Sequence, residues 1–260
     1  MDKIIIQIYE IQDPAEAQAV VEFGVDHIGS VIASEDDWKL PGLKDTIDTV
    51  QAAGGKSSLI PLYNRSESVL RTLDYYQPDI VHFCEALADQ KDMWRYCERL
   101  LDLQKNVKQR FPEIKIMRSI PIVQEGQDYE FPTLKISKIF EPISDFFLTD
   151  TLLVHEKGRQ PALQPVQGFV GITGKTCNWE IARQLVAESQ IPVILAGGIS
   201  PQNVVNAIEI TKPAGIDSCT QTNVQNQNGR AIRFRKDLKK VKAFVEAVRR
   251  AEAKLRDSGN

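Results

Sequence analysis

The sequence predicts a (β/α)8 barrel, a closed parallel sheet of eight strands surrounded by helices. Two observations lead to this fold class. Short apolar runs alternate with amphipathic helical stretches from end to end of the 260-residue chain, and there are eight such units. Eight strand–helix units in a chain of this size are typical of the barrel. A doubly wound open sheet is the alternative, but it more usually contains about five or six units.

Each strand is predicted from a short apolar run, and each helix from apolar residues that recur at helical spacing. The predicted strands are 4–8, 27–32, 57–62, 80–83, 114–120, 145–148, 193–195 and 215–218. The predicted helices are 14–23, 43–53, 66–75, 89–111, 132–140, 178–189, 201–210 and 238–255.

Domain organisation is expected to be simple, with one domain over residues 1–260, because no low-complexity linker divides the chain. A long loop at 151–177 follows the sixth strand, and loops of that length often act as lids in such barrels. A polar segment rich in Asn and Gln, 221–235, follows the eighth strand, and the chain ends in a charged helix and tail.

Composition excludes several classes of protein. The net charge of −3 argues against a general nucleic-acid binder. No apolar run approaches the ~18 residues of a membrane-spanning helix, and the N-terminus lacks the apolar stretch of a signal peptide. The four cysteines are widely spaced without a Cys-x-x-Cys pair, and no His/Asp/Glu cluster suggests a metal site. We therefore expect a cytoplasmic protein without a metal or other cofactor, either a monomer or a homodimer.

The most informative segment is 192–204, where an apolar strand leads directly into Gly197 and Gly198. The sequence then predicts a helix with Ser200 as its N-cap and Pro201 at its first position. Two glycines let a ligand approach the main chain, and free N–H groups at a helix start favour an anion. In (β/α)8 barrels this arrangement near strands seven and eight forms half of a phosphate site. The expected ligand is thus a small phosphorylated metabolite.

Several segments at strand ends resemble the phosphoribosylanthranilate isomerase family. The run Gly-Ile-Thr-Gly-Lys-Thr-Cys-Asn-Trp at 171–179 is similar to Gly-Gly-Thr-Gly-Lys-Thr-Phe-Asp-Trp of that family. Leu-Ala-Gly-Gly-Ile-Ser-Pro-Gln-Asn-Val at 195–204, Pro-Ala-Gly-Ile-Asp at 213–217 and Leu-Thr-Asp-Thr at 148–151 resemble further family segments in the same order. The match covers most of the chain and is strongest from Gly171 to Asp217.

The resemblance implies an enzyme of tryptophan biosynthesis that isomerises a phosphorylated ribosylamine to an aminodeoxyketose. That chemistry needs a general acid to open the sugar ring and a general base to remove the C2 proton. The family's acid corresponds to Asp150. The candidate phosphate or substrate contacts are Gly174, Lys175, Gly197, Gly198, Cys219 and Thr220. At the last two positions the chain departs from the family's Ser-Ser-Gly phosphate loop, and the missing glycine narrows the permitted backbone, although Thr220 and main-chain N–H groups could still bind phosphate.

The family's catalytic base is a cysteine at the end of strand one, and here the chain has Tyr9 followed by Glu10. A thiol with a pKa of about 8.5 is thus replaced by a phenol with a pKa of about 10, a poorer base at neutral pH. Tyr9, Glu10 and Cys84 are the candidates for a substitute base, with His82 and Glu85 beside Cys84.

Other departures concern cations. The family usually places an arginine after strand two to meet the anthranilate carboxylate. Here three acidic residues at 35–37 come first, and Lys39 is the only nearby cation and so the candidate for a substrate contact. Arg118, predicted at the end of strand five, is expected to face an anionic ligand or pair with a carboxylate at the barrel mouth. His155 in the predicted lid and the basic run 230–236 are weaker candidates for the site.

Three functions remain open from the sequence. The first is the isomerase reaction itself, with Asp150 and the phosphate site retained. The second is another isomerase, epimerase or lyase reaction on a phosphosugar. The third is a non-catalytic protein that binds a phosphorylated metabolite. The first is the leading hypothesis, while the pair Asp36 and Asp37 favours the second or third function.

Overall fold

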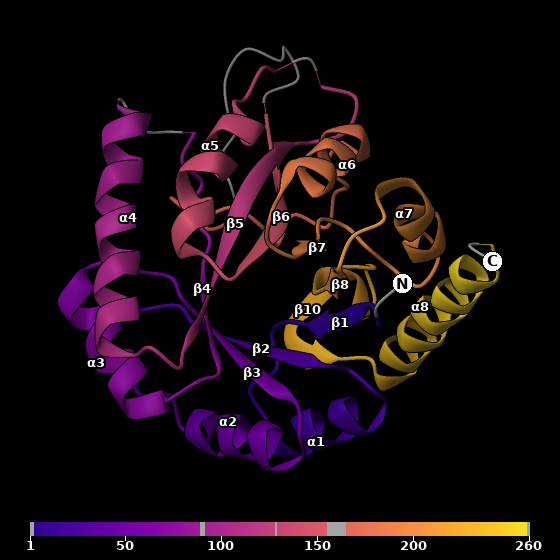
Figure 1. Ribbon diagram of the computed structural model, residues 1–260. Helices are drawn as coiled ribbons and strands as arrows, with labels where there is room; N and C mark the ends of the chain where they lie inside the picture. Colours follow the sequence, from indigo (N-terminus) through magenta and orange to yellow (C-terminus); the bar gives the residue numbers. More distant parts are fainter. Residues whose placement is uncertain (1–2, 89–91, 128, 155–164, 259–260) are drawn as a thin grey trace.

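A computed structural model describes residues 3–88, 92–127, 129–154 and 165–258, and it confirms the predicted (β/α)8 barrel. Eight parallel strands close in sequential order, and helices surround them (Figure 1). The strands are β1 (Ile5–Ile8), β2 (His27–Ile32), β3 (Lys56–Pro61), β4 (Ile80–Phe83), β5 (Lys115–Val123), β6 (Phe146–Leu152), β7 (Val193–Leu195) and β8 (Gly215–Ser218). The helices are α1 (Pro14–Glu22), α2 (Leu43–Ala52), α3 (Ser66–Tyr76), α4 (Met93–Arg110), α5 (Thr133–Phe140), α6 (Trp179–Glu188), α7 (Val204–Thr211) and α8 (Leu238–Ser258).

Strands β5 and β6 are longer than the sequence predicts. They pair in parallel from Met117 opposite Phe146 to Val123 opposite Leu152. This ladder carries both strands past the ends of their apolar runs. Arg118 therefore lies in the interior of β5, and the expectation that it ends the strand is wrong.

Helix α7 begins three residues later than predicted, at Val204 rather than Pro201. The Asn203 side chain accepts a hydrogen bond from the Ser200 amide at 2.8 Å, and the Ser200 hydroxyl accepts one from the Gln202 amide at 3.3 Å. These side chains hold the backbone of 200–203 in a turn, which competes with helix formation. Ser200 is therefore not the N-cap of α7, and the glycines precede a turn.

Two apolar layers hold the barrel together. Inward-facing side chains, among them Ile80, Met117, Leu148 and Ile194, fill its interior. Outward-facing residues such as Ile6, Ile8 and Ile216 pack against the buried faces of the helices. This alternation follows the pleat of each strand. The side chains just beyond the interior layer then face the cavity at the carboxyl ends of the strands, where barrels place their active sites.

A hairpin that the sequence did not predict follows β8. Its strands are β9 (Asn223–Gln225) and β10 (Ala231–Lys236), paired antiparallel. Lys236 is buried, and its Nζ donates to the Cys219 carbonyl at 2.9 Å and to the Asn223 side chain. The Lys236 amide donates to Glu16 in α1 at 2.7 Å. The hairpin thus fastens the β8 end of the barrel to the element that follows β1.

The longest helices of the described residues, α4 and α8, carry many charges. None of the described helices has the length and apolarity needed to cross a membrane.

Candidate active site

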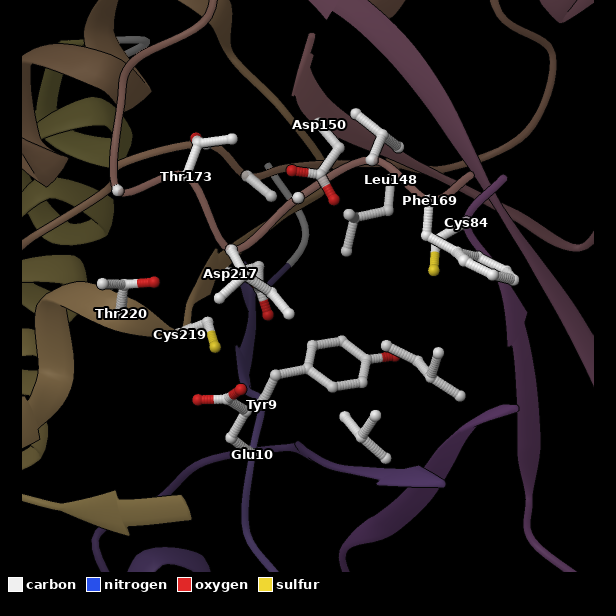
Figure 2. A pocket seen from close by; sticks show the side chains of 18 of the residues that line it. Tyr9, Glu10, Cys84, Leu148, Asp150, Phe169, Thr173, Asp217, Cys219 and Thr220 are labelled. Atoms are coloured by element: carbon white, nitrogen blue, oxygen red, sulfur yellow. The ribbon is translucent and has the colours of Figure 1, made fainter. Parts of the chain in front are cut away.

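A cavity opens at the carboxyl ends of the strands (Figure 2). Its lining comes from the ends of the strands and from the segments that follow them, including 166–174. The lining includes Tyr9, Glu10, Val31, Ile60, Leu62, Cys84, Asp150, Phe169, Gly174, Gly197, Gly198, Asp217, Cys219 and Thr220. Most of the residues expected at the site are therefore brought together, while three of them lie elsewhere.

One wall of the cavity offers unused backbone donors. The N–H groups of Gly197, Gly198 and Thr220 donate no hydrogen bond to any residue in the described parts of the chain. All three residues line the cavity, together with Gly174. All three residues are half-buried, and amides in such positions without a protein acceptor are normally satisfied by water or by a ligand. Several such amides around one space form a concavity suited to an anion.

The two glycines after β7 are also required by packing. Gly197 and Gly198 have φ angles of 90° and 61°, which side chains rarely adopt. A Cβ atom on Gly198 would lie 2.7 Å from the carbonyl carbon of Lys175, and one on Gly197 would collide with Thr151 Oγ1. The glycines thus let the segment around Lys175 lie directly on the end of β7. The anion-binding wall depends on this close contact.

Asp150, near the end of β6, extends its carboxyl group into the cavity (Figure 2). Burial raises its pKa from the ordinary value to about 7, and a hydrogen bond from the Thr151 amide at 3.0 Å opposes the shift. A Cβ atom on Gly171 would lie 2.5 Å from Asp150 Oδ2, so the glycine makes room for the carboxyl group. A carboxyl group with a pKa near 7 can give or take a proton at neutral pH.

Asp217, at the end of β8, is the cavity residue that the sequence analysis missed. Its side chain is 6% exposed and lines the cavity. Burial raises its pKa to about 8, a hydrogen bond from Gln7 Nε2 at 3.2 Å lowers it, and the charge of Asp150 raises it. The available signal was position, because Asp217 ends a strand in the segment that resembles the family.

Tyr9 does not present its hydroxyl group to the open cavity. The hydroxyl lies 2.6 Å from Ser58 Oγ and 2.7 Å from His82 Nδ1, and His82 Nε2 lies 2.8 Å from Ser119 Oγ. Burial raises the pKa of Tyr9 well above its usual value and lowers that of His82 to about 3. Both groups are therefore neutral at physiological pH. The tyrosine ring lies directly over Gly29, where a Cβ atom would be 2.5 Å from Tyr9 Cγ.

Glu10 is buried beside Tyr9, with a positive φ of 62°. Its carboxylate accepts a hydrogen bond from Arg233 Nε at 2.5 Å and one from Asn223 Nδ2 at 3.1 Å. Both partners belong to the β9–β10 hairpin. The basic run 230–236 therefore supplies one cation to the rim of the site, where Glu10 holds it.

The two cavity thiols are poor nucleophiles and bases. Burial raises the pKa of Cys84 and that of Cys219 well above the value of a free thiol, and nearby carboxylates raise the pKa of Cys84 further. The thiolate is the reactive form of cysteine. Both side chains are therefore neutral thiols at neutral pH.

Arg118 does not face the cavity, so the expected contact with a ligand is wrong, and the guanidinium pairs with a carboxylate just after β4 instead. Its side chain is 0% exposed and forms an ion pair with Glu85, which is 1% exposed. Arg118 Nε donates to Gln104 at 2.8 Å, and its guanidinium lies over the ring of Phe140. These partners lie between the barrel and its outer helices. The cause is strand parity, because Met117 and Ser119 point inward and Arg118 points outward.

The other two expected cations also lie outside the cavity lining. Lys39 is exposed, and its ammonium group lies over the rings of Trp38 and Tyr75. The Lys175 side chain is exposed, while its carbonyl accepts a hydrogen bond from Thr151 Oγ1 at 2.7 Å. His155 lies outside the described residues. Among residues that are described, no group of three or more His, Cys, Asp or Glu could hold a metal ion.

Comparison with known proteins agrees with this geometry. The model of the N-(5'-phosphoribosyl)anthranilate isomerase family matches residues 126–247, a range that includes Asp150, Asp217 and the two glycines. This part of the chain is thus similar to the phosphoribosylanthranilate isomerase family. An N-(5'-phosphoribosyl)anthranilate isomerase of Methanosarcina mazei is 25% identical over 96% of this chain and 97% of the relative.

Other proteins of that name match over different lengths. The isomerase of Methanocella arvoryzae is 28% identical, and the alignment covers 57% of this chain and 57% of that relative. The chain thus spans little more than half the length of this curated relative. The solved phosphoribosylanthranilate isomerase of Thermotoga maritima has a TM-score of 0.65 at 17% identity, over 95% of this chain and 98% of that one. This structural similarity supports the barrel fold.

Proposed function

We propose that the chain isomerises a phosphorylated ribosylamine to an aminodeoxyketose, as in the phosphoribosylanthranilate isomerase step of tryptophan biosynthesis. One observation carries the proposal. A carboxyl group with a pKa of about 7, Asp150, faces the same cavity as the unused amides of Gly197, Gly198 and Thr220. The names of the relatives support the same reaction.

In this mechanism the amides bind the phosphate group and fix the sugar relative to Asp150. The protonated carboxyl group of Asp150 gives its proton to the ring oxygen while the C1–O bond breaks. The nitrogen lone pair then forms a C=N bond to C1. Removal of the C2 proton follows, and this second step requires a base on another side of the sugar.

We further propose a cytoplasmic enzyme, monomeric or homodimeric, that does not bind nucleic acid.

Purified protein with freshly prepared phosphoribosylanthranilate tests the proposal, with loss of substrate fluorescence as the readout. The wild type should turn over, and Asp150→Asn should lose at least about 100-fold in kcat because the ring oxygen loses its proton donor. Lys39→Ala is the matched control, since this lysine lies outside the cavity lining. A wild type without turnover, at a substrate concentration that saturates binding, would refute the proposal.

A second candidate function rests on the charge of the cavity wall. No Lys or Arg is found among the described residues that line the cavity, although a carboxylate on the aglycone would favour one. The wall opposite the amides is formed by Val31, Ile60, Leu62 and Phe169. Such a wall suits a phosphosugar with an uncharged substituent. A competition experiment between ribose 5-phosphate and an analogue of the anthranilate product distinguishes the two candidates. The first requires that the analogue displaces ribose 5-phosphate from the cavity, and the second predicts that it does not.

A further inference from the structure

The proposed reaction needs a base that the strand-one position does not supply. The group must face the cavity, must be free of strong partners and must lose its proton near neutral pH. Tyr9 fails because its hydroxyl group is enclosed by Ser58 and His82. Cys84 fails because burial keeps its thiol protonated. Glu10 faces the cavity, but Arg233 and Asn223 occupy its carboxylate.

Asp217 meets these requirements by position. In the register of the barrel, Asp217 lies opposite Gln7 on the neighbouring strand β1. Like Gln7, Asp217 points its side chain into the barrel, and Gln7 Nε2 donates a hydrogen bond to Asp217 Oδ1 at 3.2 Å. This hydrogen bond orients the carboxyl group without neutralising it. Among the described residues no cation forms an ion pair with Asp217, in contrast to Glu10.

Asp150 and Asp217 approach the cavity from different strands. Asp150 and Asp217 both extend into the cavity (Figure 2). Asp150 comes from β6 and Asp217 from β8, and the short strand β7 lies between these two in the barrel. The unused amides of Gly197 and Gly198, at the end of β7, lie between the two positions. A phosphosugar anchored at these amides would therefore meet one carboxyl group on each side.

We propose that Asp217 is the general base that removes the C2 proton, acting on the intermediate that Asp150 generates. The inference rests on the proposed function and deepens it by naming the second catalytic residue. The Asp217 carboxylate takes the proton from C2, the C–H electron pair forms the C1=C2 bond, and the electrons of the C=N bond return to nitrogen. The enol oxygen then gives its proton to Asp150, and Asp217 gives its proton to C1. Both carboxyl groups end in their starting states, so no other reactant is needed.

The same pair predicts the pH dependence of turnover. Asp150 must carry a proton and Asp217 must not, and their pKa values are about 7 and about 8. Because the two charges interact, the values belong to the pair as a whole. The profile of kcat/KM should be bell-shaped, rising to a maximum between these values and falling above them.

Asp217→Asn tests the inference, with Glu10→Gln as the rival variant and circular dichroism as the check on folding. Asp217→Asn should lower kcat at least about 100-fold and remove one limb of the pH profile. Its affinity for ribose 5-phosphate should stay within about threefold. Asp217→Glu should recover part of the lost rate. Exchange of the C1 proton of the ketose product with D2O should stop in Asp217→Asn.

Two results would overturn the inference. One is an Asp217→Asn variant that retains both limbs of the pH profile. Loss of a carboxyl group with a purely structural role would lower the rate at every pH and leave the shape of the profile unchanged. The other is loss of proton exchange in Glu10→Gln and its persistence in Asp217→Asn. A wild type that neither turns over nor exchanges would instead contradict the proposed function. The two failures are therefore distinguishable.

Discussion

The contact between Tyr9 and Gly29 leads to a quantitative prediction about how the barrel is packed. A Cβ atom on Gly29 would lie 2.5 Å from Tyr9 Cγ and closer still to Cδ1 and Cε1. The tyrosine cannot easily move away, because its hydroxyl group is held by Ser58 and His82. Gly29→Ala should therefore destabilise the protein by about 3 kcal/mol, the upper end of the range for overpacked cores.

Removing the ring should remove most of this cost. In the Tyr9→Cys background the added methyl group meets open space, so Gly29→Ala should cost less than about 1 kcal/mol. The coupling energy between the two sites is then about 2 kcal/mol, a large value for a double-mutant cycle. Thermal melting can detect the effect, because the loss of about 3 kcal/mol in Gly29→Ala corresponds to a decrease in Tm of roughly 6–12 °C in a domain of this size. Equal shifts in Tm for Gly29→Ala in both backgrounds would show that the ring does not cover Gly29, and the reasoning would fail.

The remaining predictions concern buried charges. Arg118→Met should cost about 3–5 kcal/mol because it leaves Glu85 buried and unpaired; adding Glu85→Leu should recover most of this loss in a urea titration. Turnover per folded molecule should not change in either variant, and a loss of turnover would restore a ligand role to Arg118. Asp150 and Asp217 have raised pKa values in the folded state, so folding binds protons and stability should fall as pH rises. His27 and His82 have lowered pKa values in the folded state, so their contribution makes stability rise with pH, but only below about pH 6.5. Between pH 6.5 and 8.5 the Tm of the wild type should therefore decrease, and Asp150→Asn/Asp217→Asn should flatten this slope; equal slopes would contradict the assigned pKa directions.

The barrel could be predicted because its strands are buried on both faces and read as continuous apolar runs. The predicted bounds of β2, β4, β7 and β8 are those observed. The hairpin β9–β10 could not be predicted in this way. Its stability comes from polar contacts made by Lys236 and Arg233 with residues far away in the chain, and an apolar pattern does not record them.

The sequence predicts the parts of the site that depend on the course of the backbone. It is less informative about the parts that depend on the direction of a side chain. Asp150 and the glycines after β7 lie in the cavity, as the positions of strand ends imply, while their roles remain predictions. The prediction for Arg118 is wrong because β5 continues past this residue, and its side chain points to the outer face of the sheet. The end of β5 depends on its pairing with β6, which the sequence does not reveal. Asp217 was overlooked because burial, which gives a carboxyl group its unusual pKa, is visible only in three dimensions.

The seam between β1 and β8 has a consequence for biosynthesis. The first strand finds its second neighbour only after the eighth strand has been made, at Gly215–Ser218. Until then a nascent chain on the ribosome exposes two unpaired sheet edges, which favour aggregation. The polar fastening by the hairpin arrives later still. Completion of the barrel therefore waits for the synthesis of residues 215–218, and a chain stopped before residue 215 should be insoluble rather than merely inactive.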